Sequence, residues 1–125
     1  MVWDLATHHE TTHALGDIAL NRENRVVIIT GTGDEFIARH EFGDSGEIPA
    51  AVWHEVMSDA RQLIMNHLDI EVPMIAAVNG PALIHAELAL LCDVVLAADA
   101  EFQDLPHFTS SLVPVDGGHV VFPCC

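Results

Sequence analysis

Runs of apolar residues alternate with polar segments along the chain, and their spacing predicts three strands and three helices. Short runs rich in β-branched and small apolar residues, typical of strands, lie at residues 25–30, 74–78 and 93–98. Apolar side chains recur at helical spacing over residues 8–20, 49–68 and 86–91. Because strands and helices alternate, we expect an α/β domain in which the first two strands are buried.

Turn-forming segments separate these elements. Gly31-Thr32-Gly33 predicts a turn directly after the first strand, and Asn79-Gly80-Pro81 ends the second strand. A polar loop is expected over residues 34–46. The chain contains no internal repeat, low-complexity tract or linker, so we expect one domain over residues 1–125.

Acidic residues dominate the charge of the chain. Nineteen Asp and Glu residues against four basic residues give a formal net charge of −15, which repels phosphate backbones and anionic lipid surfaces. We therefore expect no nucleic acid and no membrane as a partner. No apolar run reaches the roughly 18–20 residues that span a bilayer, and the N-terminal residues lack the features of a signal peptide, so a cytoplasmic protein is expected.

Histidines stand beside apolar runs in the second half of the chain. Residues 79–123 carry His85, His107 and Asp116 between stretches that a core would bury. Imidazole has an ordinary pKa of about 6.5, which suits it to proton transfer near neutral pH. Polar groups carried to the edge of a core in this way indicate a histidine-based active site.

Longer motifs resemble a known family. The segments that carry the resemblance are RVVIITGTGDEF, IEVPMIAAVNGPAL, AELALLCDVVLAADAEF and PVDGGHVVFP. Over nearly the whole chain they resemble the crotonase (enoyl-CoA hydratase/isomerase) superfamily. The resemblance implies a crotonase-like α/β fold of repeated strand–strand–helix units. The domain of that family is considerably longer, so this chain is expected to be a partial domain, truncated at both ends.

Three departures from the hydratase pattern change the expected chemistry. Leu83-Ile84-His85 replaces the glycine-rich turn that helps to form the hydratase oxyanion hole. The segment Phe36-Ile37-Ala38-Arg39-His40-Glu41 lacks the glycine of the other oxyanion loop. His107 stands where the hydratases have a catalytic carboxylate, although Glu87 still matches the other glutamate of the family. The resemblance therefore implies chemistry on a substrate other than an acyl thioester.

With Trp3 and His8 included, the pattern resembles one branch of the family, the β-diketone hydrolases of the 6-oxocamphor hydrolase type. That branch cleaves a carbon–carbon bond of a cyclic β-diketone by a retro-Claisen reaction without a cofactor or metal. By resemblance, His107 is the general base, Asp116 orients it, and His85 stabilises the departing enolate. Trp3 and His8 would bind the small ketone substrate. The same resemblance implies a homo-oligomer, either a trimer or a dimer of trimers.

Three other functions remain open. An acyl-CoA hydratase or isomerase would use Glu87 as its principal acid and base. An inactive truncated subunit is the second alternative, because a further site glutamate of the diketone hydrolases falls after Cys125. The third is a zinc metalloprotease, since His9-Glu10-Thr11-Thr12-His13 matches H-E-x-x-H. Ala19 stands where the extended form of that motif needs a third histidine, so we expect no metal site.

Overall fold

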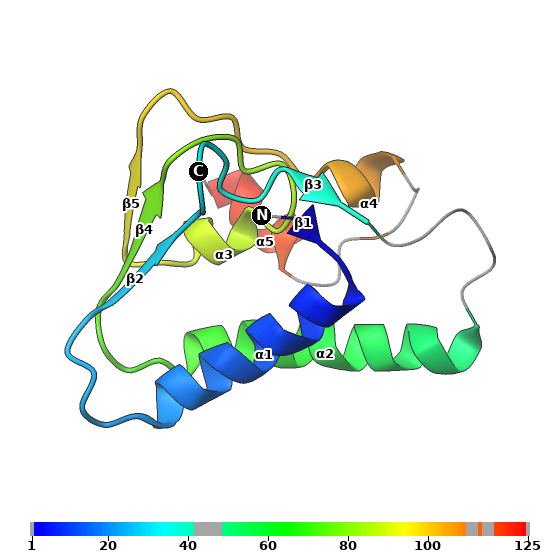
Figure 1. Ribbon diagram of the computed structural model, residues 1–125, viewed down its shortest axis with the longest axis horizontal. Helices are drawn as coiled ribbons and strands as arrows, with labels where there is room; N and C mark the ends of the chain where they lie inside the picture. Colours follow the sequence, from blue (N-terminus) through cyan, green and yellow to red (C-terminus); the bar gives the residue numbers. More distant parts are fainter. Residues whose placement is uncertain (1, 42–48, 110–112, 114–116, 125) are drawn as a thin grey trace.

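Two long helices lie side by side beneath a small parallel sheet in the computed structural model of the chain (Figure 1). The structure describes residues 2–41, 49–109, 113 and 117–124. Helix α1 spans Leu5–Leu20 and helix α2 spans Ala50–Leu68. The helices run in the same direction, and the Asn66 side chain of α2 donates a hydrogen bond of 2.8 Å to the Thr12 carbonyl of α1.

The described strands form two parallel sheets. The larger sheet has the order β2-β4-β5, with β2 at Val27–Thr30, β4 at Met74–Val78 and β5 at Val94–Ala97. The smaller sheet pairs β1, Val2–Trp3, with β3, Arg39–His40. Parallel neighbours need a crossover connection, and α2 provides one between β2 and β4. The predicted α/β fold is therefore confirmed.

Short helices follow the central strand β4. They are α3 at Glu87–Leu90, α4 at Leu105–Thr109, α5 at Gly118–Val121 and a 3₁₀ turn at Phe122–Cys124. Figure 1 shows α3 and α5 beside the larger sheet, and α4 at the other end of the short-helix layer. None of the helices in the described part of the chain is both long and apolar enough to cross a membrane.

Helix α1 begins three residues before the predicted start because Asp4 caps it. The Asp4 carboxylate accepts a hydrogen bond of 2.7 Å from the Thr7 amide, which satisfies one of the amides left open at a helix N-terminus. That hydrogen bond also lowers the pKa of Asp4 below its ordinary value. The cap fixes the turn from β1 into α1, and so it fixes the position of His8 relative to Trp3.

The core lies between the two long helices, β4 and α3. Helix α1 contributes Leu15, α2 contributes Leu63, and β4 turns Met74, Ala76 and Val78 inward. Alternate residues of a strand point to opposite faces, which explains why every second residue of β4 is buried. The predicted burial of this strand is confirmed.

The expected burial of the first strand was wrong. Its pairing begins at Val27 rather than Arg25, and the Ile28 side chain in it is 61% exposed. Strand β2 lies at one edge of the larger sheet, and Ile28 points to the face opposite that of Val27 and Ile29, which pack against the core. β-Branched composition predicted the strand correctly, but composition does not show the place of a strand in the sheet.

The predicted turns are confirmed, and they position the segment that leads to His85. A Cβ atom on Gly31 would lie 2.0 Å from the Glu35 carbonyl oxygen, and a Cβ atom on Gly80 would lie 2.0 Å from the Asp34 carbonyl oxygen. Only glycine permits such close backbone packing. The Asn79 side chain joins the two turns, since it accepts from the Gly31 amide at 3.0 Å and donates to the Gly33 carbonyl at 2.6 Å.

The segment expected to be a polar loop contains buried apolar residues. Phe36 and Ile37 are 1% and 2% exposed, and the Ile37 carbonyl accepts a hydrogen bond of 2.8 Å from the Leu83 amide. The backbone of residues 36–37 therefore supports the segment that carries His85. The polar residues that follow, His40 and Glu41, are exposed.

Candidate active site

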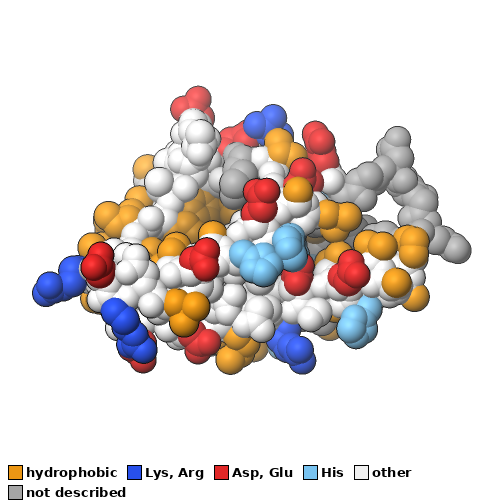
Figure 2. Space-filling view, turned by 60° about the horizontal axis from the view of Figure 1, so that its bottom comes forward, with side chains coloured by type: hydrophobic (Ala, Val, Ile, Leu, Met, Phe, Trp, Pro, Cys, Tyr) orange, Lys and Arg blue, Asp and Glu red, His pale blue; other side chains and the backbone are white. Residues whose placement is uncertain are grey.

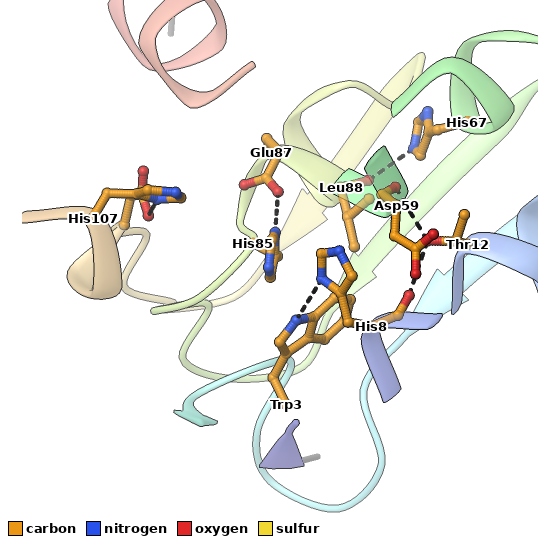
Figure 3. A network of polar contacts seen from close by, with 10 residues as sticks. Trp3, His8, Thr12, Asp59, His67, His85, Glu87, Leu88 and His107 are labelled. Carbon is orange, nitrogen blue, oxygen red and sulfur yellow. Dashed lines mark hydrogen bonds and ion pairs between the residues drawn. The ribbon is translucent and has the colours of Figure 1, made fainter. Parts of the chain in front are cut away.

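Three of the predicted site residues form one buried cluster. The ring centroids of Trp3 and His85 are 4.3 Å apart, those of Trp3 and His8 are 5.8 Å apart, and those of the two histidines are 5.7 Å apart. Trp3 is fully buried, and His8 and His85 are 3% and 8% exposed. Figure 3 shows the cluster between β1, α1 and the segment before α3. Residues far apart in the sequence thus meet in the folded chain.

A hydrogen bond determines which nitrogen of His8 carries a proton. The indole Nε1 of Trp3 lies 3.3 Å from Nδ1 of His8. An indole N–H can only donate, so Nδ1 of His8 is the acceptor, and the proton of the neutral imidazole lies on Nε2. His8 is therefore held as a donor at Nε2 in an apolar environment.

His85 is paired with a buried carboxylate that the sequence did not place in the site. Its Nδ1 lies 2.5 Å from Oε1 of Glu87, which is only 1% exposed. His85 also has a backbone φ of 49°, a left-handed conformation that costs energy in a residue other than glycine. Such conformations persist where the surrounding structure imposes them, often at functional sites. Packing and the carboxylate together fix the direction of the imidazole.

The second imidazole–carboxylate pair joins His107 of α4 to Asp104, the residue before this helix. Nδ1 of His107 is 2.6 Å from Oδ1 of Asp104, which is 4% exposed. A carboxylate on one ring nitrogen fixes the tautomer and leaves the other nitrogen to act as a base. In Figure 3 the His107 ring points toward the side on which His85 and Glu87 lie. Asp116, predicted to orient His107, lies outside the described residues.

An apolar pocket adjoins the Asp104–His107 pair. It has a volume of about 540 Å³ and includes Asp104 in its lining. The other lining residues are Phe102, Gln103, Gly118, His119, Phe122 and Pro123. A space of this size is within the usual range for a small ligand. Trp3, His8 and His85 are not among its lining residues, so the pocket adjoins the Asp104–His107 pair rather than the buried cluster.

The H-E-x-x-H segment does not contribute to this site. His9, Glu10 and His13 are exposed on α1, whereas His8 is buried. Across the described residues, no group of three or more His, Cys, Asp or Glu side chains lies in a position to hold a metal ion. The geometry of a zinc protease, with three protein ligands and a glutamate base, is not formed there.

Sequence reasoning missed Asp104, and it named Glu87 only as the acid and base of the hydratase alternative, although both carboxylates have a local signal. Asp104 precedes His107 by three residues, and Glu87 follows His85 by two, so each carboxylate is near its imidazole in the chain. Such spacing is common by chance. Only the turn at His85 and the first turn of α4 bring each carboxylate onto the ring nitrogen.

Comparison with known proteins places this site in a family. Residues 3–122 match the family model described as enoyl-CoA hydratase/isomerase. The chain belongs to this family. Its α/β architecture is that of a crotonase, which confirms the fold that the sequence motifs imply.

Solved crotonase structures agree with this assignment. A β-diketone hydrolase from the cyanobacterium Anabaena sp. PCC 7120, bound to (S)-3-oxocyclohexyl acetic acid, superimposes with a TM-score of 0.92 and 41% identity over 99% of this chain. An enoyl-CoA hydratase from Bacillus anthracis superimposes with a TM-score of 0.79 and 30% identity over 98% of this chain. The resemblance to a β-diketone hydrolase that the sequence indicated is thus confirmed.

Curated crotonase sequences point to CoA-linked enzymes. The 2,3-dehydroadipyl-CoA hydratase of Escherichia coli is 38% identical over 95 residues, which cover 74% of this chain and 36% of that protein. The carnitinyl-CoA dehydratase of Salmonella enteritidis is 34% identical over 122 residues, 91% of this chain and 46% of that protein. The chain spans about half the length of the Anabaena protein as well, at 50%.

Proposed function

We propose that this crotonase is a cofactor-independent hydrolase that cleaves a carbon–carbon bond of a cyclic β-diketone by a retro-Claisen reaction. The observation that carries the proposal is the buried Trp3–His8–His85 cluster. It occurs in a chain whose sequence is 41% identical to that of a β-diketone hydrolase. Buried imidazoles paired with carboxylates supply a base and oriented donors, which such a reaction requires.

The first step is addition of water to one carbonyl carbon of the diketone. His107 accepts a proton from the water, and the carboxylate at its Nδ1 stabilises the imidazolium that forms. A positioned general base of this kind contributes about 10²–10⁴ in rate. The water oxygen bonds to the carbonyl carbon, and the carbonyl oxygen becomes an alkoxide. An oriented N–H donor stabilises that charge, and His8, with its proton on Nε2, is suited to this role.

The second step breaks the carbon–carbon bond. The alkoxide collapses to a carboxylic acid, and the electron pair of the broken bond passes to the second carbonyl as an enolate. His85 is held at Nδ1 by the Glu87 carboxylate, and it stabilises this enolate as an imidazolium, which donates from Nε2. The proton that His107 took from water then returns to the α-carbon. One diketone and one water thus yield one keto acid, without a metal or cofactor in any step.

An acyl-CoA hydratase is the second candidate, because curated hydratases and dehydratases align with most of this chain. In that function Glu87 would carry the acid–base chemistry. Glu87 is 1% exposed and its carboxylate is engaged with His85, which favours a supporting role over direct contact with an acyl-CoA.

The discriminating experiment measures both reactions on one preparation. The chelator-treated protein is incubated with a bicyclic, non-enolisable 1,3-diketone, and the keto acid is quantified by chromatography. Hydration of crotonyl-CoA is followed in parallel by absorbance. We expect one equivalent of keto acid per diketone consumed and no hydration.

Variants assign the activity to the site. His85→Ala removes the donor at the second carbonyl, and we expect on the order of a hundredfold loss of kcat, as for loss of one oxyanion donor. His54→Ala removes an exposed histidine of α2 and should retain full activity. Hydration of crotonyl-CoA without diketone cleavage would exclude the proposed reaction in favour of the hydratase.

A further inference from the structure

Helix α1 carries a second pair of histidines on the side of the helix that faces solvent. His8 points into the core, whereas the next residue, His9, and His13 one turn later are exposed. Residues four apart lie on the same face of a helix, so the two rings are neighbours. Figure 2 shows histidine side chains gathered on this face, with acidic side chains around them.

The two imidazoles have the spacing of two ligands on one metal ion. Nε2 of His9 lies 3.1 Å from Nε2 of His13, and the ring centroids are 4.4 Å apart. Zinc–imidazole bonds are about 2.0–2.1 Å long, so two ligands on one cation have nitrogens roughly 3.0–3.4 Å apart. The separation of the two Nε2 atoms is therefore compatible with one cation that binds both.

A carboxylate from the neighbouring helix holds the first imidazole in the required tautomer. Nδ1 of His9 lies 2.9 Å from Oδ2 of Asp59 on α2. When Nδ1–H donates to Asp59, the lone pair of His9 lies on Nε2, which is the atom that faces His13. A carboxylate behind a metal-binding imidazole is the usual supporting arrangement, because it fixes the ring and makes it more basic.

The charge of the chain also favours a cation here. The formal net charge is −15, which raises the local concentration of divalent cations at the surface. Without a cation, one Nε2 must donate to the other. When a cation binds, the proton on His13 Nε2 moves to its Nδ1 through solvent, and no change in oxidation state is needed.

We propose that His9 and His13 form a surface site for a divalent transition cation of the zinc or nickel type, oriented by Asp59 and completed by water. Imidazole nitrogens suit these cations, whereas magnesium and calcium prefer oxygen ligands. The site differs from the metalloprotease alternative in using two protein ligands rather than three. It lies outside the diketone site and does not depend on the proposed function.

Calorimetric titration tests the proposal directly. The protein is prepared without a histidine tag, treated with chelator, and titrated separately with zinc chloride, nickel chloride and magnesium chloride. We expect one cation per chain. Loss of a supporting carboxylate typically lowers metal affinity 10–100-fold, so we expect Asp59→Asn to weaken binding by about 10–100-fold. Loss of a ligand lowers the affinity at least as much. His9→Ala and His13→Ala should therefore each weaken binding by at least about tenfold.

The matched control is His54→Ala, which removes another exposed histidine of the same chain. It should bind both cations as the wild type does, and circular dichroism checks that each variant is folded. Equal affinity of His13→Ala and His54→Ala would overturn the assignment, as would binding of magnesium as tight as that of zinc. Absence of any binding by the wild type would also overturn it.

Discussion

At the scale of single residues, a carboxylate partner distinguishes the site histidines from a structural one. His85 and His107 each contact a carboxylate at Nδ1, whereas His67 of α2 donates from Nε2 to the Leu88 carbonyl at 3.0 Å. Burial lowers the pKa of His67, which is 2% exposed, below its ordinary value of 6.5. Burial also raises the pKa of the neighbouring Cys92 thiol to about 11, so this thiol is unreactive near neutral pH.

The neutral state of His67 predicts a pH dependence of stability. The unfolded chain binds a proton at this residue below about pH 6.5, whereas the folded chain does so only at lower pH. The free energy of unfolding should therefore fall as the pH drops from 6.5 toward the folded-state pKa. One proton accounts for at most about 1.4 kcal/mol per pH unit.

Urea unfolding at about pH 7.5 and 5.5 measures this effect. His67→Gln keeps a donor for the Leu88 carbonyl but cannot take up a proton, so it should lose less stability than the wild type over this range. His54→Gln, at an exposed position, should behave as the wild type does. Equal losses in His67→Gln and the wild type would contradict the prediction.

The Asp104–His107 pair predicts coupled effects on the rate. His107→Ala should lower kcat for the diketone by about 10²–10⁴ with little change in KM, because a base acts mainly in the transition state. Asp104→Asn should lower kcat through loss of the oriented tautomer. If the two residues act as one unit, the double variant should be no slower than His107→Ala alone.

Steady-state kinetics of the two single variants and the double variant test this coupling. Asp99→Asn removes an exposed carboxylate and serves as the control. The same cycle with Asp116→Asn determines whether that residue also orients His107, which stays a prediction. Additive losses for Asp104 and His107 would count against their pairing in catalysis.

At the scale of elements, the orientation of α1 about its axis places His8 on the buried side and His9 and His13 on the exposed side. His8, Thr12 and Leu15 form its buried stripe, and this stripe faces α2 and the site. The adjacent stripe with His9 and His13 faces solvent. Because successive residues are about 100° apart around a helix, the start and orientation of α1 decide which imidazole enters the site.

The N-cap of α1 predicts a second pH effect. Since the pKa of Asp4 is lowered in the folded protein, its contribution to stability is present above its unfolded pKa and is lost as the pH falls through the folded value. Asp4→Ala should lower the thermal unfolding midpoint at neutral pH, and Asp4→Ser should retain most of the stability. The difference between wild type and Asp4→Ala should shrink at about pH 3.

Thermal unfolding followed by circular dichroism at both pH values is the measurement. Asp17→Ala, at an exposed position within the same helix, is the control. A pH-independent difference between wild type and Asp4→Ala would show that the carboxylate charge does not contribute. If Asp4→Ala also slows diketone cleavage, the cap positions His8 as well as the helix.

At the scale of the whole molecule, the larger sheet exposes apolar side chains along both of its edge strands. Ile28 of β2 and Leu96 of β5 are 61% and 60% exposed, and Val94 and Val95 are 46% and 37% exposed. Exposed apolar side chains of this kind favour association between protein surfaces. We therefore expect self-association, for which the family resemblance implies a trimer or a dimer of trimers.

Light scattering after size-exclusion chromatography tests this expectation. Leu96→Glu places a charge on the exposed apolar strand and should shift the protein toward the monomer. Met65→Glu makes the same kind of change on the exposed side of α2, where the Met65 side chain is 48% exposed, and should leave the mass unchanged. A monomeric wild type at micromolar concentration would contradict the expectation.

The sequence by itself determined the order and type of the main elements and the family. Helical spacing predicted α1 and α2, and the run at residues 74–78 predicted β4, because these periodicities reflect which side chains can be buried. Trp3, His8 and His85, which the family resemblance indicated, also meet in one cluster.

Only the tertiary structure decided which partners these residues have. The exposure of Ile28 depends on which face of β2 packs against the core, which no local pattern records. The pairing of His107 with Asp104, and of His9 with Asp59 on another helix, depends on distances of a few ångströms between side chains. Hydrogen bonds and metal coordination require such distances, whereas a sequence specifies only spacing along the chain.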